Sequence, residues 1–210
     1  AIMDILAKFK GALDLTAFEF FSEAALDKVV EHQGLARPFN TVAPYYALLE
    51  FEADSEADLD TAMALFETCV ENGWVLDGTL SQSQQQAANL WRLREDISET
   101  VSRWTPYKND LSVQVSKVPA FIGEVDALIA AAYPDWEVIW YGHIGDGNTH
   151  INILKPDNLS IDEFRQRCEG VSKGVFEIVQ RYRGSISAEH GVGLIKKDYL
   201  GYSRSNAEID

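Results

Sequence analysis

Two histidines flank a short stretch rich in glycine and asparagine. His143 precedes this stretch and His150 follows it, and we place the turn between Gly145 and Asn148. Glycine and asparagine tolerate the positive φ angles that tight hairpin turns need. We therefore expect two antiparallel strands in which His143 lies directly opposite His150, with Cβ atoms about 5 Å apart. Two imidazoles in that position could bind one divalent metal ion.

Asn152 lies two residues beyond His150, so we expect its side chain on the same face of the strand. The alternative interpretation is a purely structural hairpin with two histidines on its surface. Histidine is scarce in this chain, and three of its four copies fall between positions 143 and 190. This clustering favours a binding site over a chance placement.

A second segment near the C-terminal end places a carboxylate beside a histidine. Glu189 and His190 are adjacent, and Gly191 and Gly193 follow them. Glu189 could complete a set of two histidines and one carboxylate, which suits zinc or another first-row divalent ion. In a regular strand His190 would point away from Glu189 and would be free for acid–base chemistry. Alternatively, Glu189 caps a helix that starts after the glycines.

A third group of polar residues lies in the middle of the chain. Arg94 and Ser98 are four residues apart in an expected long helix, so they share one side of it, and Lys108 begins the next strand. A guanidinium and an ammonium group could together bind the carboxylates of a substrate. The alternative is a solvated helix edge with ordinary ion pairs, and spacing alone favours that alternative.

The elements that must position these residues follow an irregular order of helices and strands. Helices are expected over residues 4–13 and 23–33, between Ser55 and Gly73, and over residues 83–104, 119–132 and 161–183. Strands are expected over residues 15–21, 45–53, 74–80, 107–115, 136–144, 148–154 and 184–188. One adjacent strand pair joined by a tight turn favours an α+β fold, with an antiparallel sheet and helices on one face. A βαββαβ unit, single or doubled, accounts for the order.

Composition and charge exclude several classes of protein. The 210 residues are 46% hydrophobic and 11% aromatic, which is typical of a globular chain with one large or two small domains. The net charge of −15 argues against nucleic acid or an anionic membrane as the main partner. No apolar run approaches the roughly 18 residues of a transmembrane helix. Cys69 and Cys168 form no close-spaced motif, so we expect them to be reduced thiols in the core.

These segments together resemble a known family. Residues 142–152 resemble the G-H-x-G-D-G-N-x-H-x-N signature of FAD-linked oxidases. More narrowly, the chain resembles the C-terminal, substrate-binding cap domain of D-lactate and D-2-hydroxyglutarate dehydrogenases, which are flavoproteins of the vanillyl-alcohol-oxidase type. Residues 187–193 with 197–200 are similar to the second signature of that group, and residues 93–95 and 107–112 to its substrate segment. The resemblance implies ferredoxin-like βαβ repeats over an antiparallel sheet.

The resemblance also implies a role for each of the polar residues. It implies His143, His150 and Glu189 as ligands of a divalent metal, usually zinc, and His190 as the base that takes the substrate hydroxyl proton. The implied substrate-binding residues are Arg94, Ser98, Lys108 and Asn152. Ser98 is a departure, because the hydroxyglutarate enzymes carry threonine there.

The resemblance covers residues 1–210 as one domain and implies a flavin-dependent oxidation of a D-2-hydroxy acid, D-2-hydroxyglutarate or D-lactate, to a 2-oxo acid. FAD would be bound mainly by an N-terminal domain that nothing here resembles, and the family's extreme C-terminal tail is also missing. We therefore expect an excised fragment, inactive alone. The implied partners are that FAD-binding domain and a small 2-hydroxy acid substrate, and a homodimer is left open. The implied location is the cytoplasm or, in a eukaryote, the mitochondrial matrix. The rival hypotheses are a metal-dependent hydrolase that uses the same ligands and a non-catalytic α+β binding module.

Overall fold

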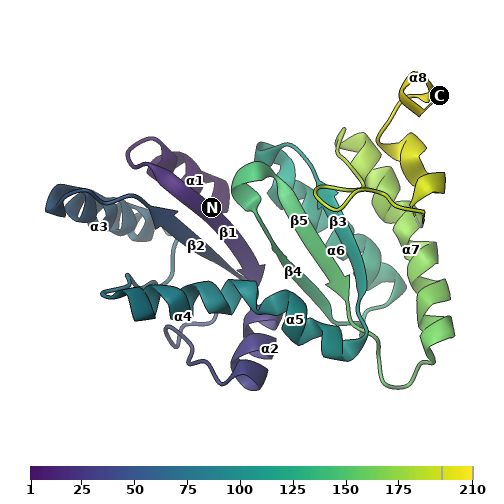
Figure 1. The fold of residues 1–210 in the computed structure, drawn as a ribbon, viewed down its shortest axis with the longest axis horizontal. Helices are drawn as coiled ribbons and strands as arrows, with labels where there is room; N and C mark the ends of the chain where they lie inside the picture. Colours follow the sequence, from purple (N-terminus) through teal and green to yellow (C-terminus); the bar gives the residue numbers. More distant parts are fainter. Residues whose placement is uncertain (195, 210) are drawn as a thin grey trace. The chain divides into compact units, whose positions relative to one another are not determined.

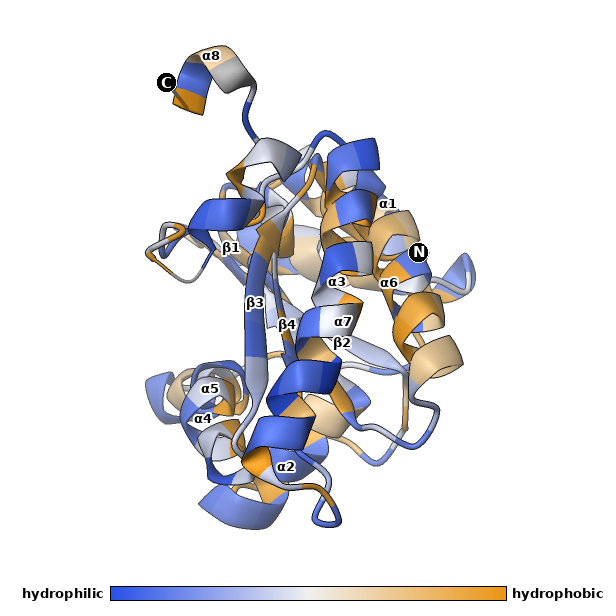
Figure 2. Ribbon diagram, turned by 90° about the vertical axis from the view of Figure 1, so that its right-hand side faces the viewer, coloured by the Kyte–Doolittle hydropathy of each residue, from blue (hydrophilic) through white to orange (hydrophobic). Residues whose placement is uncertain are grey.

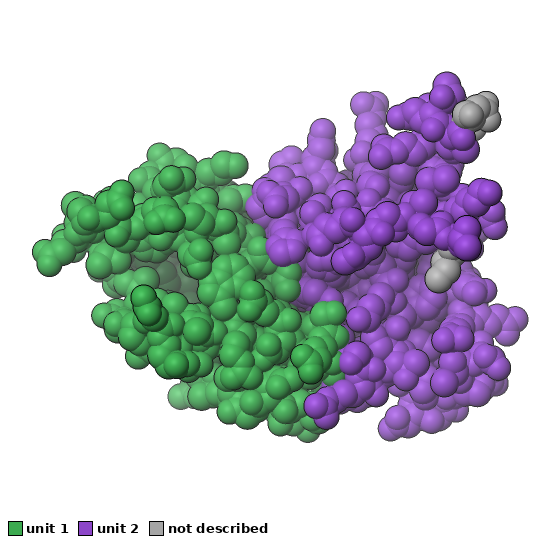
Figure 3. Space-filling model, viewed as in Figure 1, with its two compact units in different colours: residues 1–100 green, residues 101–210 purple. Residues whose placement is uncertain are grey.

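The computed structural model describes residues 1–194 and 196–209. These form two compact units, unit 1 (Ala1–Thr100) and unit 2 (Val101–Asp210), which Figure 3 distinguishes by colour. Each unit combines antiparallel strands with packed helices (Figure 1), which confirms the predicted α+β class.

Unit 1 is built around a pair of antiparallel strands. Its elements are α1 (Ile2–Lys10), β1 (Leu15–Ser22), α2 (Glu23–Gln33), β2 (Tyr45–Phe51), α3 (Glu56–Glu71), α4 (Gln84–Glu95) and all but the last residue of α5 (Ile97–Val101). Strand β1 pairs with β2, with Phe21 opposite Tyr46, and helices α1, α2 and α4 pack against β1. The Ser22 hydroxyl accepts the Ala25 N–H at 3.3 Å and caps α2. Phe18, Phe20 and Leu26 are among its buried residues.

Two predictions for unit 1 are wrong. Residues 74–80 form a loop instead of a strand. The loop follows directly on the end of α3, where the Trp74 N–H donates to the Cys69 carbonyl at 2.9 Å, and Gly78 lies against the Phe66 ring of that helix. The long helix predicted over residues 83–104 is interrupted at Asp96, where α4 ends and α5 begins. The apolar stripe nevertheless continues across the interruption, since Leu93, Ile97 and Val101 are all buried.

Unit 2 contains three strands and two long helices. Its elements are β3 (Tyr107–Ser112), α6 (Val118–Ala132), β4 (Val138–Gly142), β5 (Asn148–Ile153), α7 (Ile161–Arg181) and the short α8 (Asn206–Ile209). Strand β5 lies between β4 and β3 and is antiparallel to both. The Ser160 hydroxyl accepts the Glu163 N–H at 3.3 Å, so α7 begins where the sequence predicted.

Helices α6 and α7 cover one face of the three strands in unit 2. The Trp140 Nε1–H donates to the Asp126 carboxylate of α6 at 2.6 Å, and the Ser172 hydroxyl of α7 lies 3.1 Å from the Tyr107 hydroxyl. Figure 2 shows α6 as mostly apolar, whereas α7 carries both polar and apolar residues. Because side chains alternate along a strand, His150 and its neighbours in register must point to the opposite face.

The two cysteines behave as the sequence predicted. Cys69 and Cys168 are buried and free, and burial raises the pKa of the Cys168 thiol to about 12. Within the described ranges, the helices are too short or too polar to cross a membrane.

Candidate metal and substrate site

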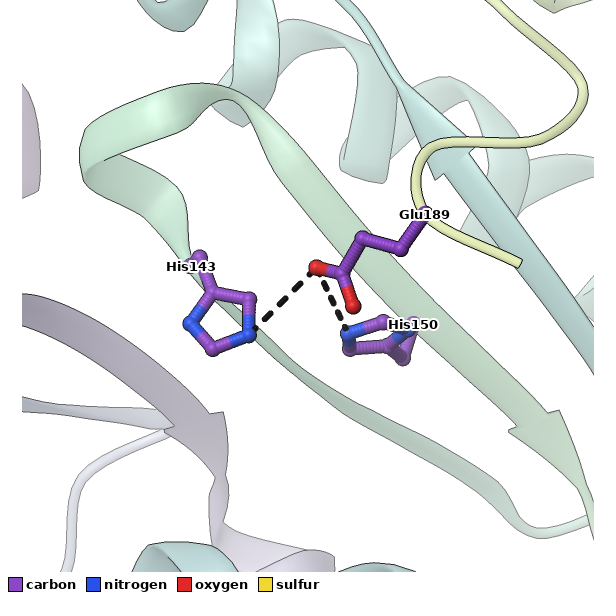
Figure 4. A group of neighbouring side chains, drawn as sticks. All are labelled: His143, His150 and Glu189. Atoms are coloured by element: carbon purple, nitrogen blue, oxygen red, sulfur yellow. Dashed lines mark ion pairs between the residues drawn. The ribbon is translucent and has the colours of Figure 1, made fainter. Parts of the chain in front are cut away.

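Three side chains of unit 2 bring their ligand atoms together (Figure 4). His143 follows β4, His150 lies on β5, and Glu189 lies on the loop after α7. Glu189 Oε1 is 3.4 Å from His143 Nε2 and 3.8 Å from His150 Nε2, and the three ligand atoms lie within 4.8 Å of one another. The edge of a tetrahedral zinc site with bonds of about 2.0–2.1 Å is about 3.4 Å long. The donor set and its spacing therefore fit a divalent metal after only a small adjustment.

The predicted strand register at this hairpin is wrong, although the predicted meeting of the histidines is right. Tyr141, not His143, lies opposite His150. The turn is longer than expected because residues 144–146 form a 3-10 turn, after which the Asn148 N–H donates to the His143 carbonyl at 3.2 Å. His143 lies outside the strand, yet its ring centroid is 5.9 Å from that of His150.

The loop that carries Glu189 and His190 is irregular. The strand predicted over residues 184–188 is reduced to a single bridge between Ser185 and Ser112, so the predicted alternation of Glu189 and His190 along a strand is wrong. His190 is exposed, and its ring centroid lies 6.3 Å from that of His150. In the described part of the chain, the helix that follows Glu189 is the 3-10 helix Lys197–Tyr202, which has no side-chain cap, so the alternative role of Glu189 as a helix cap is wrong there.

Asp110 is a residue of this site that sequence reasoning did not single out. It lies on β3 directly opposite His150, and its Oδ1 is 3.3 Å from His150 Nδ1. Its Oδ2 accepts the backbone N–H groups of Glu189 at 2.8 Å and of His190 at 3.1 Å. Burial raises the pKa of this carboxyl, but the adjacent His150 imidazole and the hydrogen bonds from the two N–H groups outweigh burial and hold the pKa well below its usual range.

Two of the predicted substrate-binding residues share this face of unit 2. Lys108 and Asn152 lie opposite each other on β3 and β5, two positions from Asp110 and His150. Lys108 is exposed. Asn152 is only 1% exposed, and its Oδ1 has no hydrogen-bond partner among the described residues. A buried amide oxygen without a partner is unusual in a folded protein and is typical of a place where a ligand supplies the donor.

The other two predicted substrate-binding residues belong to unit 1. Arg94 is near the end of α4 and is 7% exposed, and its Nε is 3.0 Å from the Oε2 of buried Glu19 on β1. The alternative of a solvated helix edge is therefore wrong for Arg94. Ser98 is exposed on α5, so the two residues lie on successive helices instead of one.

Replacing Glu19 by glutamine tests how firmly Arg94 is held. We expect the free energy of unfolding to fall by about 1.5–3 kcal/mol, because the ion pair between two buried groups becomes a contact between one charged and one neutral group. Urea denaturation followed by circular dichroism measures the change. Glu71→Gln, at an exposed position on α3, is the matched control and should stay within about 0.5 kcal/mol of wild type. Equal effects of the two substitutions would contradict a stabilising pair.

Comparison of the sequence with known proteins identifies the family of the chain. The sequence matches the family described as FAD linked oxidases, C-terminal domain, over residues 1–210. A D-2-hydroxyglutarate dehydrogenase of Stutzerimonas stutzeri (strain A1501) is 62% identical over 210 residues, which are 100% of this chain and 45% of that protein. One of Xanthomonas citri pv. viticola is 54% identical over 208 residues, 99% of this chain and 44% of that protein. The mitochondrial enzyme of Bos taurus is 35% identical over 193 residues, 90% of this chain and 34% of that protein.

The chain thus spans less than half of the length of these curated relatives. The match to the family over all 210 residues confirms the resemblance that the histidine motifs indicated. This chain belongs to the FAD-linked oxidase C-terminal domain family.

Proposed function

We propose that this chain is the substrate- and metal-binding domain of a flavin-dependent D-2-hydroxy acid dehydrogenase that oxidises D-2-hydroxyglutarate to the 2-oxo acid. The observation that carries the proposal is the convergence of His143, His150 and Glu189 beside His190 on one face of unit 2, in a chain of this family. The names of the relatives at 62% and 54% identity support D-2-hydroxyglutarate over D-lactate.

The metal ligands would be the two histidines and Glu189. A divalent ion held there, zinc in our proposal, would supply Lewis acidity toward the α-hydroxyl and carboxylate oxygens of the substrate. The two imidazoles are neutral donors and Glu189 carries one negative charge, so a divalent ion with its three ligands would carry a net positive charge, and Lys108 on the same face would offset the carboxylate of Asp110. Such a site suits an acidic substrate although the chain as a whole carries −15.

The proton of the substrate hydroxyl would pass to His190. Its imidazole lies beside His150 but outside the set of three ligand atoms, and histidine changes its charge near neutral pH. The redox step would belong to FAD, which would accept the hydride from C2.

The remaining residues would hold the carboxylates of the substrate. Lys108 offers an ammonium group on the same face as His150, and Asn152 offers a buried amide beside it. Arg94 and Ser98 are proposed to bind the distal carboxylate, for which a planar guanidinium is well suited.

FAD would be bound by an N-terminal domain of a longer protein. The relatives, of which this chain covers 45% or less, support such an arrangement. The mitochondrial name of the bovine relative supports a mitochondrial location only for eukaryotic members, and we propose the cytoplasm for a bacterial one.

The test is a substrate screen on the complete protein expressed from its own reading frame. We expect bound FAD, about one equivalent of zinc per chain, and anaerobic reduction of the flavin by D-2-hydroxyglutarate but not by its L enantiomer. D-Lactate serves as the comparison that measures how much the distal carboxylate contributes. Metal-dependent hydrolysis of esters or phosphates without any flavin would favour the hydrolase instead, and failure to bind any metal would favour a non-catalytic module.

A further inference from the structure

We infer that Asp110 is the positioning residue of the proposed metal centre, holding His150 in the tautomer that can bind a metal and fixing the loop that supplies Glu189 and His190. The inference rests on the proposed metal-binding role of His150 and Glu189. In this role Asp110 would touch neither the metal nor the substrate, but it would orient the ligand atoms of His150 and Glu189 toward the metal.

The position of Asp110 fixes the tautomer of His150. Neutral imidazole carries a proton on only one nitrogen, and a carboxylate can only accept hydrogen bonds. Asp110 Oδ1 faces His150 Nδ1 at 3.3 Å, so the proton belongs on Nδ1. The lone pair is then on Nε2, the nitrogen that lies 3.8 Å from Glu189. A carboxylate behind a metal-binding histidine is a recurrent way to fix its orientation.

Asp110 also holds the loop that carries Glu189 and His190. Asp110 Oδ2 accepts two successive backbone N–H groups, those of Glu189 and His190, at 2.8 Å and 3.1 Å. The backbone carbonyl of Asp110 also accepts the Ala188 N–H at 3.3 Å. One residue of β3 therefore binds three consecutive N–H groups of a loop that otherwise has no regular structure. This fixes Glu189 and His190 in position relative to His150.

Replacing Asp110 by asparagine separates these two effects. The amide oxygen can still accept the N–H groups of the loop, but the amide NH₂ would then face His150 Nδ1. His150 would have to accept a hydrogen bond there, which moves its proton to Nε2 and blocks the metal-binding nitrogen. We expect the zinc dissociation constant of the full chain to rise about 10- to 100-fold.

The readouts are the tautomer of His150 and zinc affinity, both measured on the full 210-residue chain. Nitrogen-15 NMR of the histidine side chains in the metal-free chain should show the Nδ1–H form of His150 in the wild type and the Nε2–H form in Asp110→Asn. Titration with zinc alone, against a competing chelator, gives the affinity. Asp126→Asn is the matched control, because Asp126 also accepts a hydrogen bond but on the opposite face of unit 2, and both readouts should stay unchanged.

The inference is overturned if His150 is in the Nε2–H form in the wild type, a measurement that needs no variant to fold. It is also overturned if Asp110→Asn keeps the wild-type tautomer and binds zinc within twofold of wild type. Both results leave the proposed function standing as long as the wild type binds zinc. A wild type that binds no metal would instead refute the proposed metal site, while the tautomer measurement would still decide the role of Asp110.

Discussion

Replacing His143 and His150 together by alanine is expected to lower the oxidation of D-2-hydroxyglutarate by the complete flavoprotein about 1000-fold or more. Losing both imidazoles leaves Glu189 as the single ligand of the proposed set, which cannot retain the metal. The expected loss corresponds to about 4 kcal/mol of transition-state stabilisation, the scale of a Lewis acid acting on a substrate oxygen. The measurement is the rate of anaerobic flavin reduction, together with the metal and FAD content of the same preparation.

The fourth histidine of the chain provides the control for this experiment. His32 is exposed on α2 in unit 1 and has no part in the proposed site. His32→Ala should keep wild-type turnover and metal content. The double variant should lose its zinc and keep its FAD, which distinguishes loss of the metal centre from general unfolding. Turnover close to wild type in a double variant shown to be free of metal would refute the catalytic role of the metal.

Replacing Gly147 by alanine is expected to lower the free energy of unfolding by at least about 3 kcal/mol and to weaken zinc binding with it. Gly147 has φ +80°, and a Cβ built on it would lie 2.1 Å from the backbone carbonyl oxygen of Val113. The left-handed conformation alone costs alanine about 1–2 kcal/mol. Val113 cannot easily move away from the added methyl group, because its own N–H donates to the Gly147 carbonyl at 3.1 Å. This hydrogen bond ties the two backbone segments together.

Gly170 offers a matched substitution without this penalty. It lies within α7, and a Cβ at that position meets nothing within 4 Å. Gly170→Ala should leave zinc binding unchanged and should raise stability by up to about 1 kcal/mol, because alanine is the better helix former. Chemical denaturation with and without zinc measures both variants. A Gly147→Ala protein within 0.5 kcal/mol of wild type would show that the turn can adjust, contrary to our expectation.

Features set by neighbouring residues could be predicted from the sequence. Ser22 and Ser160 begin helices because a hydroxyl at that position binds an N–H three residues later, which is a local event. The meeting of His143 and His150 was also predictable, because a glycine-rich turn of almost any length returns the chain on itself. The register was not predictable, because it depends on whether residues 144–146 make a 3-10 turn.

Features that depend on distant segments could not be predicted. Residues 74–80 have the apolar character of a strand but form a loop after the C-terminal end of α3, where Gly78 lies against the Phe66 ring. Asp110 was missed because its three partners, His150, Glu189 and His190, come from elements that a sequence does not place beside β3. Asp110 lies opposite His150 because β3 pairs with β5, and the sequence alone does not reveal that pairing.

Helix α7 separates His150 from Glu189 along the sequence, and this separation affects the order in which the parts of unit 2 fold. His143 and His150 belong to one hairpin, whose closure is local and therefore fast. Glu189 reaches them only after the 21 residues of α7 have folded and packed back along the strands, which closes a much longer loop. We therefore expect the complete ligand set to form late in folding. A metal ion that needs all three ligands would act on a nearly native chain and would slow its unfolding more than it speeds its folding.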